Sequence, residues 1–203
     1  MLFDIHIHSN ISPCSSLELD EIINKAKRTG LDGICITDHQ SMEAKTLICE
    51  GMQKNGLYVI IGMEYSTCDG DFLIFGINNN IPIDLTAEKL LNHVKKLKGA
   101  AIAAHPFRKA RPAKEYTVKS KLCNIVESIN GRNTAIENSK VNVWRKKYSF
   151  TECGGSDAHT LQEIGKVKTR FFTDISSSED FVHALNNGLC TPEQTFKNKN
   201  VSN

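Results

Sequence analysis

The chain has 203 residues, of which 40% are hydrophobic and 24% charged, as in an ordinary soluble globular domain. No run approaches the roughly 20 apolar residues of a transmembrane helix, and the first residues have neither the basic nor the apolar region of a signal peptide. The net charge of +2 is too small to indicate nucleic-acid binding, and seven cysteines without CxxC spacing fit reduced thiols better than disulfides. These features predict a cytoplasmic protein.

Short apolar runs alternate with longer amphipathic runs in the first half of the chain. A turn at residues 68–71 leads into a further apolar run, which predicts a hairpin rather than a helix there. We expect helices over residues 16–29, 42–54 and 87–98. The strands expected in this half cover residues 2–8, 32–37, 58–63 and 72–77.

The second half continues the alternation, with an exposed basic loop over residues 106–114. Strands are predicted over residues 101–104, 125–129, 150–154 and 167–173, and helices over residues 134–147 and 178–187. Seven main strands alternating with helices predict one domain over residues 1–196, built as a small barrel of parallel strands. An open doubly wound sheet is the alternative. The polar residues 197–203 are expected to fray.

Candidate metal ligands follow the predicted strands. His6 and His8 end the first strand two residues apart, so both imidazoles share one face of it with Asp4, while Ile5 and Ile7 share the other. The other candidates follow later strands: Asp38, His39, Glu64, His105, Asp157 and His159. Active sites of parallel α/β folds lie at this edge, and burying so many polar groups without a metal would be costly. A metal site is therefore predicted.

The donor set combines imidazoles with carboxylates, which suits Zn, Mn or Fe better than Ca or Mg. There are more donors than one ion takes, so we expect two or three divalent ions that share a carboxylate. Such centres stabilise the attacking and leaving oxygens of phosphoryl transfer. By contrast, His93 and His183 lie within predicted helices and are assigned structural roles.

The ordered motifs resemble those of the polymerase and histidinol phosphatase (PHP) superfamily. They are His6-Ile7-His8, Thr37-Asp38-His39, Glu64, Ala104-His105-Pro106 and Gly155-Ser156-Asp157-Ala158-His159, and they span residues 4 to 159. The resemblance implies a distorted seven-stranded (β/α) barrel with a trinuclear metal site that hydrolyses phosphoesters. It assigns His6, His8, Glu64 and Asp157 to a first ion, Glu64 and His105 to a second, and His39 and His159 to a third. Glu64 and Asp157 are then the catalytic carboxylates.

Two positions depart from the pattern of this superfamily. Its members usually supply a His or Asp in the loop after the first motif, where Cys14 is the only residue here with ligand chemistry. We expect Cys14 to be a thiolate ligand; the alternative is a small buried filler, with water completing the third ion. Many relatives also place a His after the bridging Glu, where this chain offers only Asp69 or Asp71.

Arginines near these motifs are candidate substrate ligands. Arg108 and Arg132 each follow a predicted strand, and guanidinium binds phosphate through two parallel hydrogen bonds; solvated surface charge is the alternative. Glu127 is a candidate partner for a ligand histidine.

The predicted function is metal-dependent hydrolysis of a small phosphorylated metabolite or nucleotide. The chain lacks the GxSxG, P-loop and GxGxxG motifs of other enzyme classes. Two alternatives are an exonuclease that trims nucleic-acid ends and a non-catalytic metal-binding regulatory module. Short loops without interleaved aromatic and basic residues make nucleic acid the less favoured partner, and no membrane is expected. The sequence predicts no particular oligomeric state.

Overall fold

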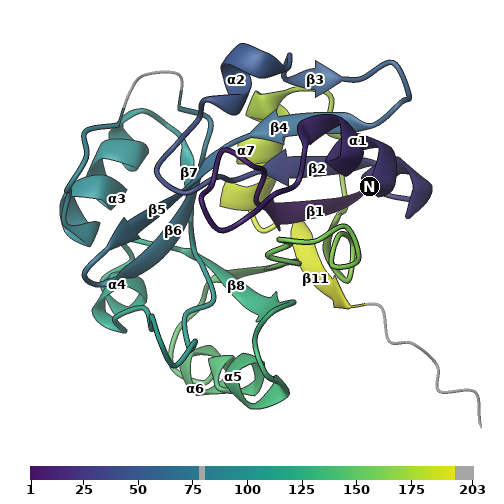
Figure 1. Cartoon of the computed structure of the whole chain (residues 1–203). Coiled ribbons are helices and arrows are strands. Elements are labelled where there is room, and N and C mark those ends of the chain that lie inside the picture. The colour runs from purple at the N-terminus through teal and green to yellow at the C-terminus, as the bar shows by residue number, and fades with distance from the viewer. Residues whose placement is uncertain (78–80, 195–203) are drawn as a thin grey trace, which may run out of the picture.

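Two mixed sheets form the frame of the protein. The computed structural model describes residues 1–77 and 81–194. In this part of the chain, one sheet contains β1 (Leu2–Ile7), β2 (Gly33–Ile36), β3 (Gly51–Met52), β4 (Tyr58–Ile61), β10 (Val167–Phe171) and β11 (Cys190–Gln194), in the order β11-β10-β1-β2-β4-β3. The other contains β5 (Met63–Thr67), β6 (Gly70–Phe75), β7 (Ala100–Ala103), β8 (Ile125–Asn130) and β9 (Thr151–Gly155), in the order β5-β6-β7-β8-β9 (Figure 1).

Each sheet contains three parallel strands flanked by antiparallel ones. β1, β2 and β4 are parallel in the first sheet, and β7, β8 and β9 in the second. The predicted β5–β6 hairpin is present, and it reverses the chain between the two parallel sets. The predicted α/β class is confirmed, but the strands described here do not close into one barrel. Among the described residues, two isolated bridges, Ile7–Ala158 and His39–Glu64, join the sheets, and both lie at or next to predicted ligands.

Helices pack on the outer faces of the sheets, except the last one, which packs against the apolar side chains between the sheets. They are α1 (Leu19–Arg28), α2 (Ala44–Leu47), α3 (Ala87–Lys96), α4 (Tyr116–Lys119), α5 (Ala135–Ser139), α6 (Val141–Arg145) and α7 (Ser178–Asn186). The side chain of Thr86 accepts the backbone N–H of Lys89 at the start of α3, as expected of an N-cap residue. No helix in the described ranges has the length and apolar character to cross a bilayer.

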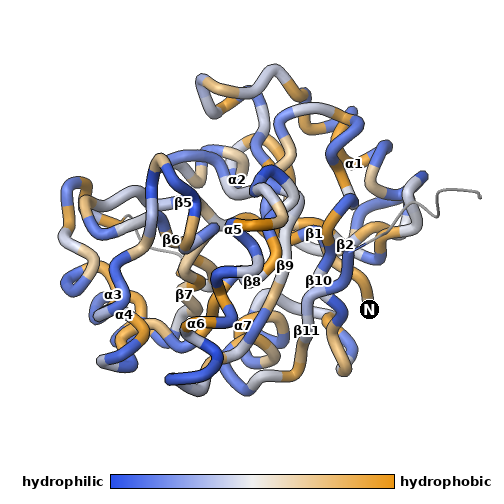
Figure 2. The backbone as a smooth tube through the Cα atoms, turned by 90° about the horizontal axis from the view of Figure 1, so that it is seen from below, coloured by the Kyte–Doolittle hydropathy of each residue, from blue (hydrophilic) through white to orange (hydrophobic). Residues whose placement is uncertain are grey.

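Apolar side chains from both sheets meet in a central cluster closed by α7. Phe3, Phe171 and Phe181 pack there with ring centroids 5.2–5.9 Å apart. In Figure 2 the hydrophobic stretches concentrate along the strands, and the hydrophilic stretches lie mostly toward the periphery. Two further clusters lie under α1 and α2 and under α3, α4 and α6. This packing leaves one end of the sheets to polar side chains.

The predicted alternation along the first strand is wrong in detail. The register between β1 and β2 shifts between Asp4 and Ile7. Ile5 therefore packs in the central cluster and Ile7 in the cluster under α1 and α2. Asp4 accepts the backbone N–H groups of Ser156 and Gly165 and does not join the donors around the histidines.

Three other element predictions need correction. Residues 42–54 form α2 and then β3, because Gly51 adopts a φ of +115° and Asn55-Gly56 makes a hairpin turn toward β4 rather than a helix end. Residues 134–147 form two short helices, α5 and α6. Neither α4 nor β11 was predicted. Pro192 argued against a strand at β11, but β11 lies at the edge of its sheet, where proline is tolerated. The predicted tail at residues 197–203 lies outside the described residues.

Candidate metal centre

The predicted donors gather where the parallel strands end, around a pocket of about 350 Å³, and Glu64 among them lies in the antiparallel strand β5, three residues after the end of β4. Its lining consists of His39, Glu64, Asp71, His105, Arg108, Arg111, Arg132, Asp157 and His159. Larger hollows of about 650 and 770 Å³ open elsewhere on the described surface. Neither contains a group of three clustered metal-binding side chains, so the smaller pocket is the candidate site.

Three groups of side chains present ligand atoms within 4.8 Å of one another. His6 belongs to two of these groups and so does His8, and the Nε2 atoms of the two histidines are 3.1 Å apart. The groups are His6, His8 and Asp157; His6, Glu64 and His105; and His8, Cys14, His39 and His159. All eight predicted metal-binding residues thus converge, although their grouping differs from the assignment that the resemblance implied: His6 also joins His105, and His8 joins His39.

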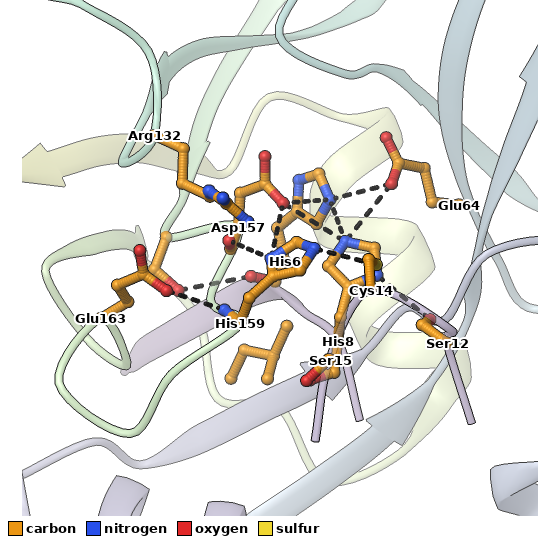
Figure 3. A network of polar contacts seen from close by, with 12 residues as sticks. His6, His8, Ser12, Cys14, Ser15, Glu64, Arg132, Asp157, His159 and Glu163 are labelled. Carbon is orange, nitrogen blue, oxygen red and sulfur yellow. Dashed lines mark hydrogen bonds and ion pairs between the residues drawn. The ribbon is translucent and has the colours of Figure 1, made fainter. Parts of the chain in front are cut away.

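Glu64 contacts histidines of all three groups, and Figure 3 shows its carboxylate directed toward His6 and His8. Its Oε1 is 2.8 Å from Nε2 of His105, and its Oε2 is 3.1 Å from Nδ1 of His39 and 3.3 Å from Nε2 of His8. Burial by itself would raise the pKa of this carboxyl, but the charge on His6 and the hydrogen bond from His105 hold the pKa well below its ordinary value. An ionised carboxylate with several nitrogen neighbours is suited to bridge cations.

Asp157 faces His6 and His8 on one side and Arg108 on the other. Its Oδ1 is 3.3 Å from Nε2 of His8, and its Oδ2 is 2.6 Å from Nη2 of Arg108. Burial again opposes ionisation, but His6, His8 and Arg108 hold the pKa of Asp157 well below its usual range. Asp157 and His105 have φ values of +55° and +31°. Non-glycine residues seldom adopt this region, and such strained backbone is often found at functional sites.

Glu127 orients two of the histidines, in agreement with its expected role as the partner of a ligand histidine. Its carboxylate is buried and accepts Nδ1–H of His6 at 2.9 Å, the backbone N–H of His105 at 2.8 Å and the amide of Asn130 at 2.9 Å. Because Nδ1 of His6 is bonded to Glu127, the other ring nitrogen, Nε2, is directed at the donor groups. Nδ1 of His105 is buried and has no hydrogen-bond partner among the described residues. An unpartnered buried nitrogen in an imidazole and carboxylate cluster fits a site for divalent metal ions.

Gly155 lies against His6 and Glu127, so Gly155→Ala should disturb the centre. An added Cβ would lie 2.5 Å from Cβ of His6 and 2.8 Å from Oε1 of Glu127. We expect a loss of stability of about 1–3 kcal/mol and metal affinity lowered about 10- to 100-fold. Gly154→Ala is the matched control, because its Cβ would meet Val167 at 2.8 Å and Ile129 O at 3.1 Å, away from the donors. Chemical denaturation and metal titration of both variants check this, and equal metal affinity would contradict it.

Cys14 lies on an ordered loop beside the third group. Its Sγ is 3.1 Å from Nε2 of His159, and the residue is exposed. The buried carboxylate of Asp38 holds this loop, since it accepts the backbone N–H and hydroxyl of Ser9 and the hydroxyl of Ser12. Asp38, a candidate ligand in the sequence, therefore fixes the conformation of the loop that carries Cys14. Its position in the motif did not indicate this role.

The other predicted side chains divide between the pocket and its surroundings. Of the two acidic residues offered after Glu64, Asp71 lines the pocket, 3.0 Å from Nη2 of Arg111, whereas Asp69 accepts a hydrogen bond from Tyr116. The Asp71–Arg111 pair was not predicted; only the basic run at residues 106–114 pointed toward it. Arg132 is exposed at the mouth, and its guanidinium has no ion pair in the described part of the chain. His93 and His183 are outside the donor groups.

Two protein-family models together match most of the chain. The PHP domain model matches residues 4–105, and the PHP-associated model matches residues 135–190. The chain belongs to the PHP domain family. The predicted family is thereby confirmed, and with it the enzyme class, a metal-dependent phosphoesterase.

Two curated relatives illustrate this membership. An uncharacterized protein of Methanocaldococcus jannaschii is 31% identical over 117 residues, which cover 53% of this chain and 68% of that protein. A probable histidinol-phosphatase of Thermotoga maritima is 36% identical over 47 residues, which cover 23% of this chain and 20% of that protein.

Solved structures share the fold at low sequence identity. PsfC from Pseudomonas syringae superposes with a TM-score of 0.77 at 17% identity, over 96% of this chain and 91% of that one. A two-domain protein of Bacteroides vulgatus containing a predicted PHP-like metal-dependent phosphoesterase gives 0.71 at 18%, over 96% and 64%. The lesion-specific endonuclease PfuEndoQ from Pyrococcus furiosus gives 0.68 at 19%, over 95% and 58%. This chain therefore spans only about three fifths of the last two structures.

Proposed function

We propose that this PHP-family protein hydrolyses a phosphoester bond of a small phosphorylated metabolite or nucleotide, using two or three divalent ions. The observation that carries the proposal is the convergence of three donor groups on Glu64 and Asp157, at the base of a pocket with arginines. The predicted ligands are His6, His8, Cys14, His39, Glu64, His105, Asp157 and His159, with Zn, Mn or Fe as the ions.

The bound ions supply Lewis-acid stabilisation of the charge that develops on phosphoryl oxygens. The protein's part is to hold and orient. Glu64 bridges between the groups, and Asp157 draws His6 and His8 together. Glu127 keeps His6 in the tautomer whose Nε2 is free for an ion. The resemblance also supports interpreting the two sheets as one distorted barrel. Its two seams are the places where the sheets meet through the isolated bridges Ile7–Ala158 and His39–Glu64, next to these ligands.

The pocket favours a small phosphorylated substrate. Its volume of about 350 Å³ is near the lower end of ordinary ligand sites, and Arg108, Arg111 and Arg132 surround it. Guanidinium groups bind phosphate oxygens through paired hydrogen bonds. The free state of all seven cysteines supports our proposal of a cytoplasmic location, where thiols stay reduced.

Nucleic-acid cleavage is the second candidate function. The fold likeness to the endonuclease from Pyrococcus furiosus favours it, although that chain is considerably longer than the region matched here. A panel of phosphomonoesters and 5′- or 3′-labelled oligonucleotides, assayed with Mn²⁺ or Zn²⁺ and again with chelator, distinguishes the candidates. We expect metal-dependent release of phosphate from the small esters. Turnover of oligonucleotides alone would favour the nuclease, and no turnover at full metal occupancy would favour the regulatory module.

The two arginines at the mouth should have separable effects. Arg132 is exposed and unpaired among the described residues, so Arg132→Ala should raise KM about tenfold and leave kcat and metal content unchanged. Arg108 also supports Asp157 through its 2.6 Å contact, so Arg108→Ala should lower kcat as well as raise KM. Steady-state kinetics with metal analysis measure both. Unchanged KM in Arg132→Ala would remove that residue from the substrate site.

A further inference from the structure

The three donor groups differ in chemistry. The two inner groups each contain a carboxylate, from Asp157 or Glu64, and all their members are buried. The third group, which we call the outer group, consists of His8, Cys14, His39 and His159 and contains no carboxylate. Carboxylates suit harder ions such as Mn²⁺, whereas thiolate and imidazole suit softer ones such as Zn²⁺.

The outer group is arranged around one point. The ring of His8 lies 4.5 Å from the rings of both His39 and His159, measured between centroids. Nδ1 of His159 is engaged by the carbonyl of Asp157 at 2.9 Å, which leaves its Nε2 to face Sγ of Cys14 at 3.1 Å. Cys14, His39 and His159 belong to this group alone and offer one thiol and two imidazoles, a donor set that suits zinc, and His8, which the first inner group shares, is available as the fourth donor.

The loop that carries Cys14 is held in place by several hydrogen bonds. Besides the contacts of Asp38 with Ser9 and Ser12, the backbone N–H of His39 donates to Ser12 Oγ at 3.0 Å. The hydroxyl of Ser15 donates to the carbonyl of His8 at 2.9 Å. Cys14 is thus tied to the segments that carry His8 and His39, so little reorganisation is needed to bring its sulfur onto an ion.

The outer group also differs in access to solvent. Three of its four members reach solvent: the side chains of His39 and His159 are 33% and 13% exposed and Cys14 is exposed, whereas His8 is fully buried. The side chains of the inner members His6, Glu64, His105 and Asp157 are at most 2% exposed. An ion in the outer group is therefore the one nearest to bulk solvent. Exchange of this ion would not require the inner groups to open.

From these observations, and resting on the function proposed above, we propose that the centre holds two kinds of ion. The outer group binds Zn²⁺ through the thiolate of Cys14, and the inner groups accept harder ions such as Mn²⁺. Cys14 is then a determinant of metal selectivity.

Cobalt titration of the metal-free full chain tests the thiolate directly. A Co²⁺ ion bound to a thiolate has a near-ultraviolet charge-transfer band that imidazole and carboxylate ligands do not produce. We expect this band to grow with one equivalent of Co²⁺ and to disappear when one equivalent of Zn²⁺ is added. In Cys14→Ser the band should be absent, and the affinity for one Zn²⁺ should fall at least about tenfold while Mn²⁺ binding is kept. Cys49→Ser, at another exposed cysteine, is the matched control and should behave like the parent.

A second measurement uses the unaltered protein, so it does not depend on how a variant folds. One equivalent of Zn²⁺ should protect Cys14 from alkylation by iodoacetamide and leave the exposed Cys49 reactive, as peptide mass spectrometry would detect. Ion binding without a thiolate band and without protection of Cys14 would overturn the proposal. Phosphoesterase activity in those samples would leave the proposed function intact, whereas failure to bind any ion would refute both.

Discussion

Glu64→Gln is expected to lower kcat for phosphoester hydrolysis by at least about 10³-fold, with the fold retained. The amide preserves the shape of the side chain but removes the charge that faces His8, His39 and His105 within 3.3 Å. The amide nitrogen also cannot coordinate a cation, so the bridge between the groups is lost. Asp157→Asn should act in the same way, because Asp157 faces His6 and His8.

The measurement combines steady-state kinetics with metal analysis and circular dichroism. Both variants should lose at least one ion and keep the parent's spectrum. Glu193→Gln is the matched control: its carboxylate pairs with Arg170 on the surface, and removing that charge should leave turnover unchanged. Turnover by Glu64→Gln at the parent's rate would refute the metal-hydrolase mechanism.

Removing the ions with a chelator should abolish turnover and lower the melting temperature. Ions that bind only the folded chain stabilise it by about 2.7 kcal/mol at a free concentration 100 times Kd. For a chain of this size, that corresponds to a shift on the order of 5–10 °C. The effect should be large here because His6, His8 and Glu64 are buried together, and the ions neutralise the carboxylates that this cluster encloses.

Thermal unfolding before and after chelation, followed by addition of Mn²⁺, Zn²⁺ or both, measures this stabilisation. Full recovery of the melting temperature should coincide with the return of two or three equivalents of metal. The Glu64→Gln variant should show a smaller shift, since it binds fewer ions. Less than one equivalent under every condition, with no change in melting temperature, would contradict a metal-dependent centre.

Much of the candidate centre was predictable because its signals are local. Apolar runs mark the strands, and a residue that follows a run lies at the C-terminal end of that strand. This reasoning located His39, Glu64 and His105 at one edge before any pairing was known. The same local signals predicted the β5–β6 hairpin and the helix α3. Where Asn55-Gly56 allowed both a helix end and a hairpin turn, the local pattern was ambiguous and the prediction was wrong.

The arrangement of the candidate donors around one another was decided only by tertiary structure. Cys14 and His159 are separated by 145 positions, and their contact depends on how β1 and the segment after β9 meet at the Ile7–Ala158 bridge. The choice between Asp69 and Asp71 depends on where the β5–β6 hairpin turns, since Asp71 lies in β6 opposite Ser66 and Asp69 lies in the turn before that strand.

The sequence by itself determined the α/β class, the family and the set of candidate donor residues, because each is encoded in runs and motifs a few residues long. Only the folded chain decided that the strands form two sheets with seams at the ligands, that Asp38 clamps the Cys14 loop, and that Arg108 supports Asp157. These features arise from pairings between distant segments. Such pairings follow from the packing of the whole core, which no short stretch of sequence contains.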